Sequence, residues 1–245
     1  MKNLFSALSL CCAGLFLPAQ VSAQSEQDFI DVFAGQWYVF DGDMRAGDDA
    51  CSLVLSPERK EDVLPVITRE CAVGLASSDN WKIVDGQIIL FSREVETAVL
   101  GGNQFRVTGE LPNSGISLVV ERASGDGTSQ QIAAALRKHK CYFTGFTQRC
   151  ANPSDLGKPI ISPETGYAFV ELLVNLHTRT QPRRDAPSLG TIATGTKLKV
   201  NQCLTASDGT WCRARVGQQN IWIAMTALRQ SEWPIVTFTA AITEG

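Results

Sequence analysis

Hydrophobic and polar side chains alternate along two stretches near the start of the chain, residues 35–40 and 51–55. A bulky apolar residue at every second position is the period of a strand with one buried face. Six similar stretches follow before residue 123, separated by turn sequences such as Asp85-Gly86. The predicted strands are residues 35–41, 51–56, 65–70, 81–84, 87–93, 95–100, 104–110 and 116–122. Eight short strands in succession predict an up-and-down β-barrel.

Two stretches have a helical period instead. Phe29 and Phe33 lie on one helical face shortly after Ser25. Ser25 and Asp28 have the spacing of a capping box, which predicts that a helix begins here. Residues 130–139 follow Ser129 and end in basic residues, as a capped helix does. The second is the short helix expected in a connecting region.

The β pattern resumes after a proline-containing stretch at residues 152–163. Strands are predicted at 167–170, 197–202, 211–216 and 221–224. We therefore predict an all-β protein with an eight-stranded up-and-down barrel followed by a smaller β domain. The predicted divisions are a cleaved signal peptide (1–23), the barrel (24–124), a linker with a helix and a disulfide loop (125–163), the second domain (164–230) and a C-terminal tail (231–245).

The N-terminus predicts export. Lys2 precedes a short apolar run, and the segment Val21-Ser22-Ala23 is typical of a signal-peptide cleavage site. Cys11 follows Leu10 and lacks the Gly or Ala that precedes a lipidated cysteine, so lipoprotein processing is disfavoured. We expect a periplasmic or secreted protein of bacterial type with no transmembrane segment, because no second long apolar run follows.

Charge argues against a nucleic-acid partner. The whole chain has 22 basic and 25 acidic residues, and the predicted mature chain loses one lysine. Without a basic excess there is no electrostatic basis for binding phosphates along a nucleic acid.

Six cysteines remain after removal of residues 1–23. An even number of cysteines in an oxidising compartment favours disulfides, although six allow 15 connectivities. They fall in sequential pairs, which predicts three local bridges, and they lack the close spacing of a zinc site. The predicted disulfides are Cys51–Cys71, Cys141–Cys150 and Cys203–Cys212.

No catalytic motif is present in the sequence. The mature chain has two histidines, His139 and His177, and neither lies in a known catalytic or metal-binding pattern. Ser78-Asp79-Asn80 matches a β-lactamase triplet but lacks its companion motifs, so we interpret it as a polar loop. An acidic cluster at residues 41–49 lacks the spacing of a calcium loop and is interpreted as a solvated turn. We predict no enzymatic activity, no cofactor and no bound metal.

The first domain carries a distinctive ordered set of residues: Gly35-Gln36-Trp37, Cys51, Cys71, Asn80-Trp81, Asp85-Gly86 and the closing strand at residues 116–122. As an ordered set, rather than singly, these residues resemble the Inh family of bacterial metalloprotease inhibitors. The resemblance implies a small exported barrel that blocks a zinc protease. Both tryptophans are expected in the barrel core.

The same resemblance implies an inhibitory arm at the mature N-terminus. In that family the arm enters the protease cleft in an extended form and offers its α-amino group to the catalytic zinc. The corresponding residues here are Gln24, Ser25, Glu26 and Gln27. An α-amine titrates near 7.7 to 8 and so offers a lone pair near neutral pH.

The second domain has its own ordered set of residues: Leu176-His177-Thr178-Arg179, Leu189-Gly190, Gly195-Thr196, Trp211 and Ile221-Trp222-Ile223. This set resembles the pattern of bacterial SH3 (SH3b) domains. Such domains bind peptides or cell-wall stems through aromatic grooves, which implies a groove formed by Tyr167, Trp211 and Trp222. The alternative for each tryptophan is core packing.

These observations predict an exported inhibitor of a metallopeptidase, either the cell's own or a host's. The SH3-like domain is expected to bind a peptide, a protein or the cell wall. The alternative is a non-inhibitory envelope scaffold that binds peptidoglycan or an envelope protein through that domain.

Overall fold

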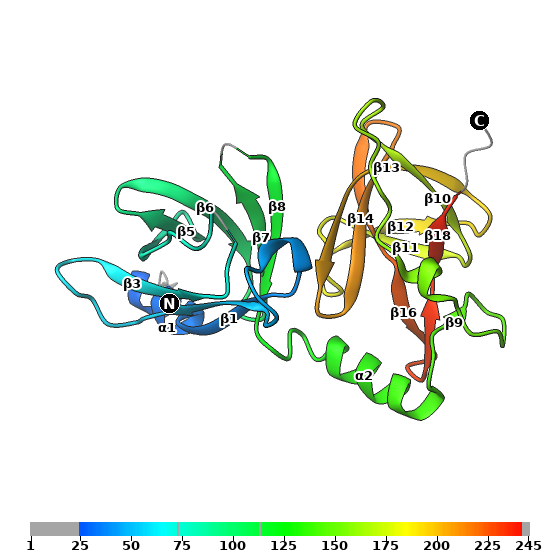
Figure 1. Ribbon diagram of the computed structural model, residues 1–245, viewed down its shortest axis with the longest axis horizontal. Coiled ribbons are helices and arrows are strands. Elements are labelled where there is room, and N and C mark those ends of the chain that lie inside the picture. Colours follow the sequence, from blue (N-terminus) through cyan, green and yellow to red (C-terminus); the bar gives the residue numbers. More distant parts are fainter. Residues whose placement is uncertain (1–24, 73, 113, 242–245) are drawn as a thin grey trace, which may run out of the picture.

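The computed structural model describes residues 25–72, 74–112 and 114–241. Within these ranges the chain forms two β units, with helix α1 (Glu26–Phe33) on the first and helix α2 (Thr128–His139) leading into the second. Figure 1 shows the two units beside each other, with α2 running below the strands of the second unit. The predicted all-β class is confirmed. The predicted signal peptide (1–23) lies outside the described residues.

The first unit is a closed barrel in which each strand pairs with the next and β1 pairs with β8. All of these pairings are antiparallel. The predicted eight-stranded barrel is therefore confirmed. Its strands are β1 (Gly35–Val39), β2 (Cys51–Leu55), β3 (Leu64–Arg69), β4 (Asn80–Val84), β5 (Gln87–Ser92), β6 (Val95–Gly102), β7 (Arg106–Leu111) and β8 (Ile116–Glu121), with a 3-10 turn η1 (Gly42–Met44) between β1 and β2.

Helix α1 packs into the core of the barrel. Ile30 and Phe33 are buried in the cluster that contains Trp37 and Trp81. The indole nitrogen of Trp37 donates a hydrogen bond to the Phe33 carbonyl at 2.7 Å, which satisfies a polar atom that burial would otherwise leave unpaired. Both tryptophans are at most 1 % exposed, as expected for core residues.

Arg122 fixes the junction between α1 and β1. Its guanidinium lies 4.2 Å from the Trp37 ring and donates hydrogen bonds to the carbonyls of Val32 and Ala34 at the end of the helix. Gly35 sits at φ +107°, and a Cβ there would lie 2.8 Å from the same guanidinium. Glycine is therefore required where the chain leaves the helix and enters the barrel.

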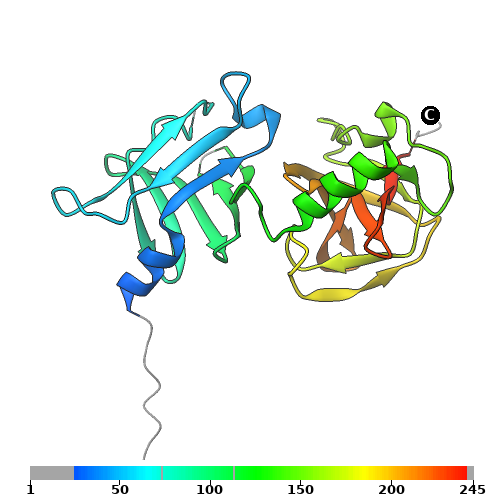
Figure 2. The same ribbon diagram turned by 90° about the horizontal axis from the view of Figure 1, so that it is seen from below.

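The second unit contains a seven-stranded sheet of order β12-β11-β15-β14-β13-β10-β18 and a three-stranded sheet of order β16-β17-β9. In Figure 2, α2 lies across the strands near the C-terminus. The strands are β9 (Phe143–Thr144), β10 (Ala168–Leu172), β11 (Leu176–Arg179), β12 (Ser188–Ile192), β13 (Lys197–Ala206), β14 (Gly209–Val216), β15 (Gln219–Ala224), β16 (Thr226–Arg229), β17 (Trp233–Val236) and β18 (Phe238–Ala240), with a 3-10 turn η2 (Pro153–Leu156) before β10.

Two predicted boundaries need correction. The predicted tail at 231–245 contains β17, which pairs with β16, and β18, which pairs with β10. The predicted linker at 125–163 contains β9, which pairs in parallel with β17. Apolar side chains such as Ile235 and Phe238 are buried in the core of the second unit. The second unit therefore extends beyond residues 164–230 at both ends, because its core needs these strands.

All three predicted disulfides are present: Cys51–Cys71, Cys141–Cys150 and Cys203–Cys212. The first joins the start of β2 to the segment after β3, the second closes the loop around β9, and the third links β13 to β14. Disulfides persist in oxidising compartments, so the protein belongs outside the cytoplasm.

Candidate functional sites

The predicted inhibitory arm lies at the start of α1. Ser25 is the N-cap, and its hydroxyl accepts a hydrogen bond from the Asp28 backbone amide while the Asp28 carboxylate accepts one from the Ser25 amide. The hydrogen bond from the Ser25 backbone amide, followed by the Ser25 side chain, lowers the pKa of Asp28. The structure thus places Glu26 and Gln27 in the first helical turn rather than in an extended arm. Gln24 lies outside the described residues.

The side chains of this turn are exposed, and two further contacts hold it. Glu26 forms an ion pair of 2.7 Å with Arg59, and Gln27 donates a hydrogen bond to Asp31 at 2.8 Å. An exposed ion pair of this kind contributes little to stability. The capping box is therefore the main local reason why these residues are helical.

Of the three aromatic residues predicted to form a groove, Tyr167 lies apart from the two tryptophans. Tyr167 lines a pocket of about 640 Å³ beside Phe169, with the Lys199 ammonium 4.4 Å from its ring. Trp211 is 1 % exposed, and Trp222 packs against the cluster that contains it. The predicted aromatic groove is corrected accordingly, because Trp211 is used to pack the second unit against the barrel.

A different pocket, with a volume of about 310 Å³, opens between β11, β16 and the Cys141–Cys150 loop. Its lining includes Phe146, His177, Arg179, Arg184 and Arg229, together with apolar side chains beneath them. We call it the arginine pocket. Sequence reasoning missed it because its residues come from segments that are far apart in the chain. The only signal in the sequence was that His177 and Arg179 stand two positions apart, which puts both side chains on the same face of β11.

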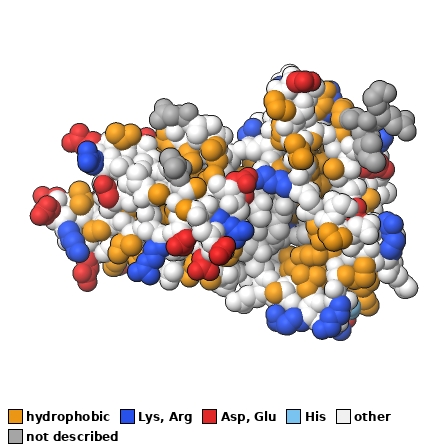
Figure 3. All heavy atoms as spheres, in the orientation of Figure 1, with side chains coloured by type: hydrophobic (Ala, Val, Ile, Leu, Met, Phe, Trp, Pro, Cys, Tyr) orange, Lys and Arg blue, Asp and Glu red, His pale blue; other side chains and the backbone are white. Residues whose placement is uncertain are grey.

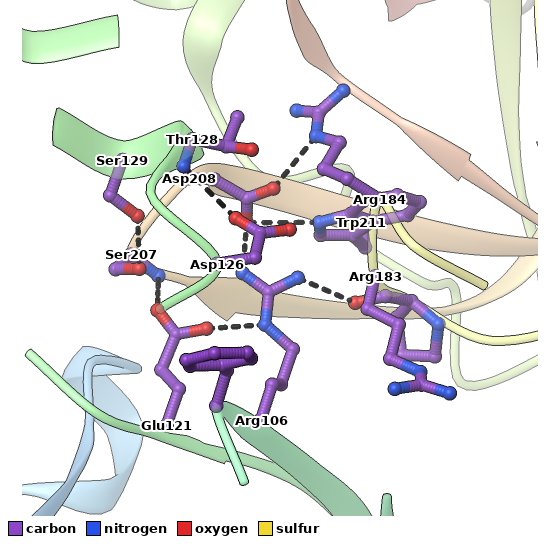
Figure 4. Close-up of polar contacts among 12 residues, drawn as sticks. Arg106, Glu121, Asp126, Thr128, Ser129, Arg183, Arg184, Ser207, Asp208 and Trp211 are labelled. Carbon is purple, nitrogen blue, oxygen red and sulfur yellow. Dashed lines mark hydrogen bonds and ion pairs between the residues drawn. The ribbon is translucent and has the colours of Figure 1, made fainter. Parts of the chain in front are cut away.

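A buried ion-pair network joins the barrel to the second unit (Figure 4). Arg106 of β7 donates to Glu121 of β8 at 2.5 Å and to Asp208, in the turn between β13 and β14, at 2.8 Å. Asp208 also accepts from Arg184 at 2.8 Å and from the indole nitrogen of Trp211 at 3.1 Å. Because Arg184 lines the arginine pocket, the network connects the barrel wall to that pocket.

Backbone groups complete the network. Arg106 donates to the Pro182 carbonyl at 3.2 Å, and the Ser207 amide donates to Glu121 at 2.9 Å. The Arg106 side chain is 2 % exposed and the side chains of Glu121 and Asp208 are fully buried. Buried charges are tolerated only when they are paired and hydrogen-bonded, as these are.

The two carboxylates of the network have opposite pKa shifts. Burial raises the pKa of Glu121 to about 7, although Arg106 opposes the shift. Burial acts in the same direction on Asp208, but Arg184 and Arg106 outweigh it and lower the pKa of Asp208. Asp208 has two arginine partners and Glu121 shares one of them, which explains the difference.

Further contacts cross between the two units. Val119 of β8 packs in one buried cluster with Leu204 and Trp211. Lys158 lies 3.2 Å from both Asp41 and Asp43, so the acidic cluster predicted to be solvated is partly paired across the interface. These contacts, together with the ion-pair network, form a partly buried interface between the two units.

The described residues lack two other kinds of feature. They contain no group of three or more His, Cys, Asp or Glu side chains placed to hold a metal. In the same part of the chain, no helix has the length and apolar character needed to cross a bilayer.

Comparison with known proteins gives no family assignment. No protein-family model matches the chain, and no curated protein matches it. Among solved structures, one similar chain is the antimicrobial peptidase lysostaphin from Staphylococcus simulans, at 14% identity over 67% of this chain and 75% of that one, with a TM-score of 0.26. A likeness this distant carries no functional argument.

Proposed function

We propose that this chain is an exported protein that binds and blocks a zinc metallopeptidase without itself catalysing a reaction. The observation that carries the proposal is the closed eight-stranded barrel with the exposed first turn of α1 at one end. Its order of Trp37, Cys51, Cys71 and Trp81 is the order on which the resemblance to the Inh inhibitors rests. The three disulfides support export.

The geometry changes how such an inhibitor would act. If cleavage follows Ala23, the mature chain has a single residue, Gln24, before the N-cap of α1. A longer extended arm would form only if the first turn of α1 unwinds and the capping box is lost, which costs about 1 kcal/mol. We therefore expect Gln24 and Ser25 to make the contacts at the zinc, with Glu26 and Gln27 at the rim of the cleft.

Inhibition constants test this proposal. Three forms of the mature protein are compared against secreted zinc endopeptidases: the intact chain with a free α-amine, the chain lacking residues 24–27, and the chain with an acetylated terminus. Intact protein is expected to inhibit, and the other two forms to lose at least a hundredfold in affinity, which corresponds to about 3 kcal/mol. Equal inhibition by all three forms would show that the N-terminus is not used.

A non-inhibitory envelope scaffold that acts through the second unit is the second candidate function. The arginine pocket supports it, because this unit then carries a binding surface of its own. Sedimentation with purified peptidoglycan distinguishes the candidates. A scaffold that binds the wall sediments with it whether or not residues 24–27 are present, whereas an inhibitor stays in solution and acts on the peptidase.

A further inference from the structure

We propose that the arginine pocket binds the free C-terminal carboxylate of a peptide whose last residue is apolar. This inference deepens the peptide-binding role suggested for the second unit and does not depend on peptidase inhibition. The pocket has guanidinium groups at its rim and an apolar interior, and the two kinds of group lie close enough for one terminal residue to contact both.

The guanidinium groups at the rim are anchored. Arg184 is held by Asp208 and by the carbonyl of Thr226 at 2.6 Å. Arg179 donates to the Ala186 carbonyl at 2.9 Å, and Arg229 donates to the Phe146 carbonyl at 3.1 Å. A guanidinium has five N–H donors, so each anchored arginine keeps donors for a ligand. Anchoring also reduces the conformational entropy lost on binding.

The charge of the pocket is unbalanced. Its lining contains three arginines and His177 but no Asp or Glu. Among the described residues, Arg179 and Arg229 have no carboxylate within ion-pair distance. The protein as a whole has a formal net charge of −3, so this local excess of positive charge is not a general property of its surface. An anionic group is the complementary ligand.

The interior of the pocket is apolar. Leu176, Trp211 and Ile235 line it and are buried, while Phe146 is 59% exposed at its edge. Arg229 lies 5.9 Å from the Phe146 ring and 5.6 Å from the Trp233 ring, which orients its guanidinium. Figure 3 shows hydrophobic side chains gathered over β9 and β16, with Lys and Arg side chains beside them.

A C-terminal apolar residue fits both features at once. It carries its side chain and its carboxylate on the same Cα, whereas an internal Asp or Glu has no apolar side chain to fill the interior. A volume of about 310 Å³ accommodates one residue rather than an extended segment. Capture of a terminal carboxylate is a known mode of peptide recognition, and arginine binds carboxylates in a bidentate geometry.

The ligand test uses the mature full-length protein and three fluorescently labelled hexapeptides. Two have the same sequence ending in leucine, one as the free acid and one as the carboxamide, and the third is a free acid ending in glycine. The leucine free acid is expected to bind at least tenfold more tightly than either of the others, as measured by fluorescence anisotropy. Equal affinity of the acid and the amide, or no binding of the acid at about 1 mM, would overturn the proposal.

The variant test distinguishes binding in the arginine pocket from nonspecific attraction of the peptide to positive charge on the surface. Arg179→Gln and Arg229→Gln are each expected to weaken binding of the leucine free acid at least tenfold and to leave the carboxamide unchanged. The matched control is Arg215→Gln, because Arg215 is exposed on β14 and outside the pocket. An equal loss in the control would contradict the proposal. Arg229→Lys keeps the charge but loses the bidentate geometry, and it should bind the acid with intermediate affinity.

Peptidase inhibition measured on the same preparations keeps this inference separate from the proposed function. If the protein inhibits a peptidase but binds the free acid and the carboxamide equally well, only the carboxylate-binding role of the arginine pocket is refuted. A protein that binds the free acid selectively and inhibits no peptidase refutes only the inhibitor. Circular dichroism of each variant shows whether it is folded, and a misfolded Arg229→Gln is replaced in the comparison by Arg179→Gln.

Discussion

The barrel and the second unit are both built from short antiparallel strands, but they join them differently. In the barrel every strand pairs with its neighbours in sequence, and among the pairings of the described strands only the closure of β1 on β8 joins distant residues. In the second unit β10 pairs with β13 and β18, and β9 pairs with β17 from the other end of the segment. The barrel is therefore made of local hairpins, whereas the second unit depends on long-range pairing.

This difference affects where binding surfaces arise. Consecutive hairpins put neighbouring residues of the sequence side by side, so the surface of the barrel can be traced along the chain. Long-range pairing collects residues from distant segments at one place, as Phe146, Arg179 and Arg229 are collected around the arginine pocket. A pocket assembled in this way is lost when any contributing segment is removed.

The largest expected effect comes from dividing the second unit. Residues 164–230 expressed alone lack β9, β17 and β18, and so they lack the buried side chains of Ile235 and Phe238. We expect this fragment not to unfold cooperatively, whereas residues 125–241 should do so. Thermal unfolding followed by circular dichroism checks both. Cooperative unfolding of the shorter fragment would mean that the long-range strands are dispensable.

Next in size is the loss of the interface arginine. Arg106→Ala leaves the carboxylates of Glu121 and Asp208 buried with fewer partners, which is expected to cost about 3 to 5 kcal/mol of stability. Urea denaturation at pH 8 measures the change. Arg215→Ala removes an exposed arginine and should change stability by less than about 0.5 kcal/mol. A similar small change for Arg106→Ala would contradict the structure of the interface.

A smaller effect is expected from Glu121→Gln, and it depends on pH. The folded-state pKa of Glu121 is raised from 4.5 to about 7. The raised pKa means that the folded state binds the proton more tightly than the unfolded state. The resulting stabilisation is fully present below about pH 4.5 and is lost as the pH rises through 7. The amide cannot titrate, so the stability of wild type relative to Glu121→Gln should fall across that window, by up to about 3 kcal/mol.

Urea denaturation at intervals of pH between 4 and 8 checks this slope. The lowered pKa of Asp208 acts in the opposite sense, because the contribution of Asp208 to stability is lost only under more acidic conditions. Wild type and Glu121→Gln both contain Asp208, so both share this effect. A difference between wild type and variant that stays constant with pH would show that Glu121 titrates normally.

The smallest effect is expected at the N-cap of α1. Ser25→Ala removes the hydroxyl that accepts from the Asp28 amide and should cost about 1 kcal/mol, whereas Ser25→Asp should be nearly neutral. Urea midpoints of the three proteins provide the measurement. An unchanged midpoint for Ser25→Ala would mean that the first turn is already frayed, which would leave Glu26 and Gln27 free to extend.

Much of the barrel was predictable from the sequence because alternation and turn residues are local signals. Each predicted strand from Gly35 to Arg122 lies within a few residues of the observed one, and the sequential cysteine pairing was correct. Strands β17 and β18 were missed, because buried residues follow one another in β17 without alternation and β18 has only three residues.

The sites were less predictable than the fold. Trp211 looked suitable for a groove, but its burial results from contact with Val119 of the barrel, which no local pattern reveals. Arg106 and Asp208 are 102 positions apart, so their pairing had no signal in the sequence. The capping box at Ser25 was visible, yet its consequence for the arm required the observed helix.

The central claim is that the two units carry separate binding surfaces, one for a peptidase at α1 and one for a peptide carboxylate at the arginine pocket. Both views show α1 at the lower end of the barrel, while the second unit stands beside the barrel (Figures 1 and 2). The most direct measurement is calorimetric titration of a zinc peptidase into the mature protein, with and without saturating leucine free-acid peptide. We predict a 1:1 complex whose affinity changes less than about twofold when the peptide is present. Displacement of the peptidase by the peptide, or no complex in either titration, would contradict the claim.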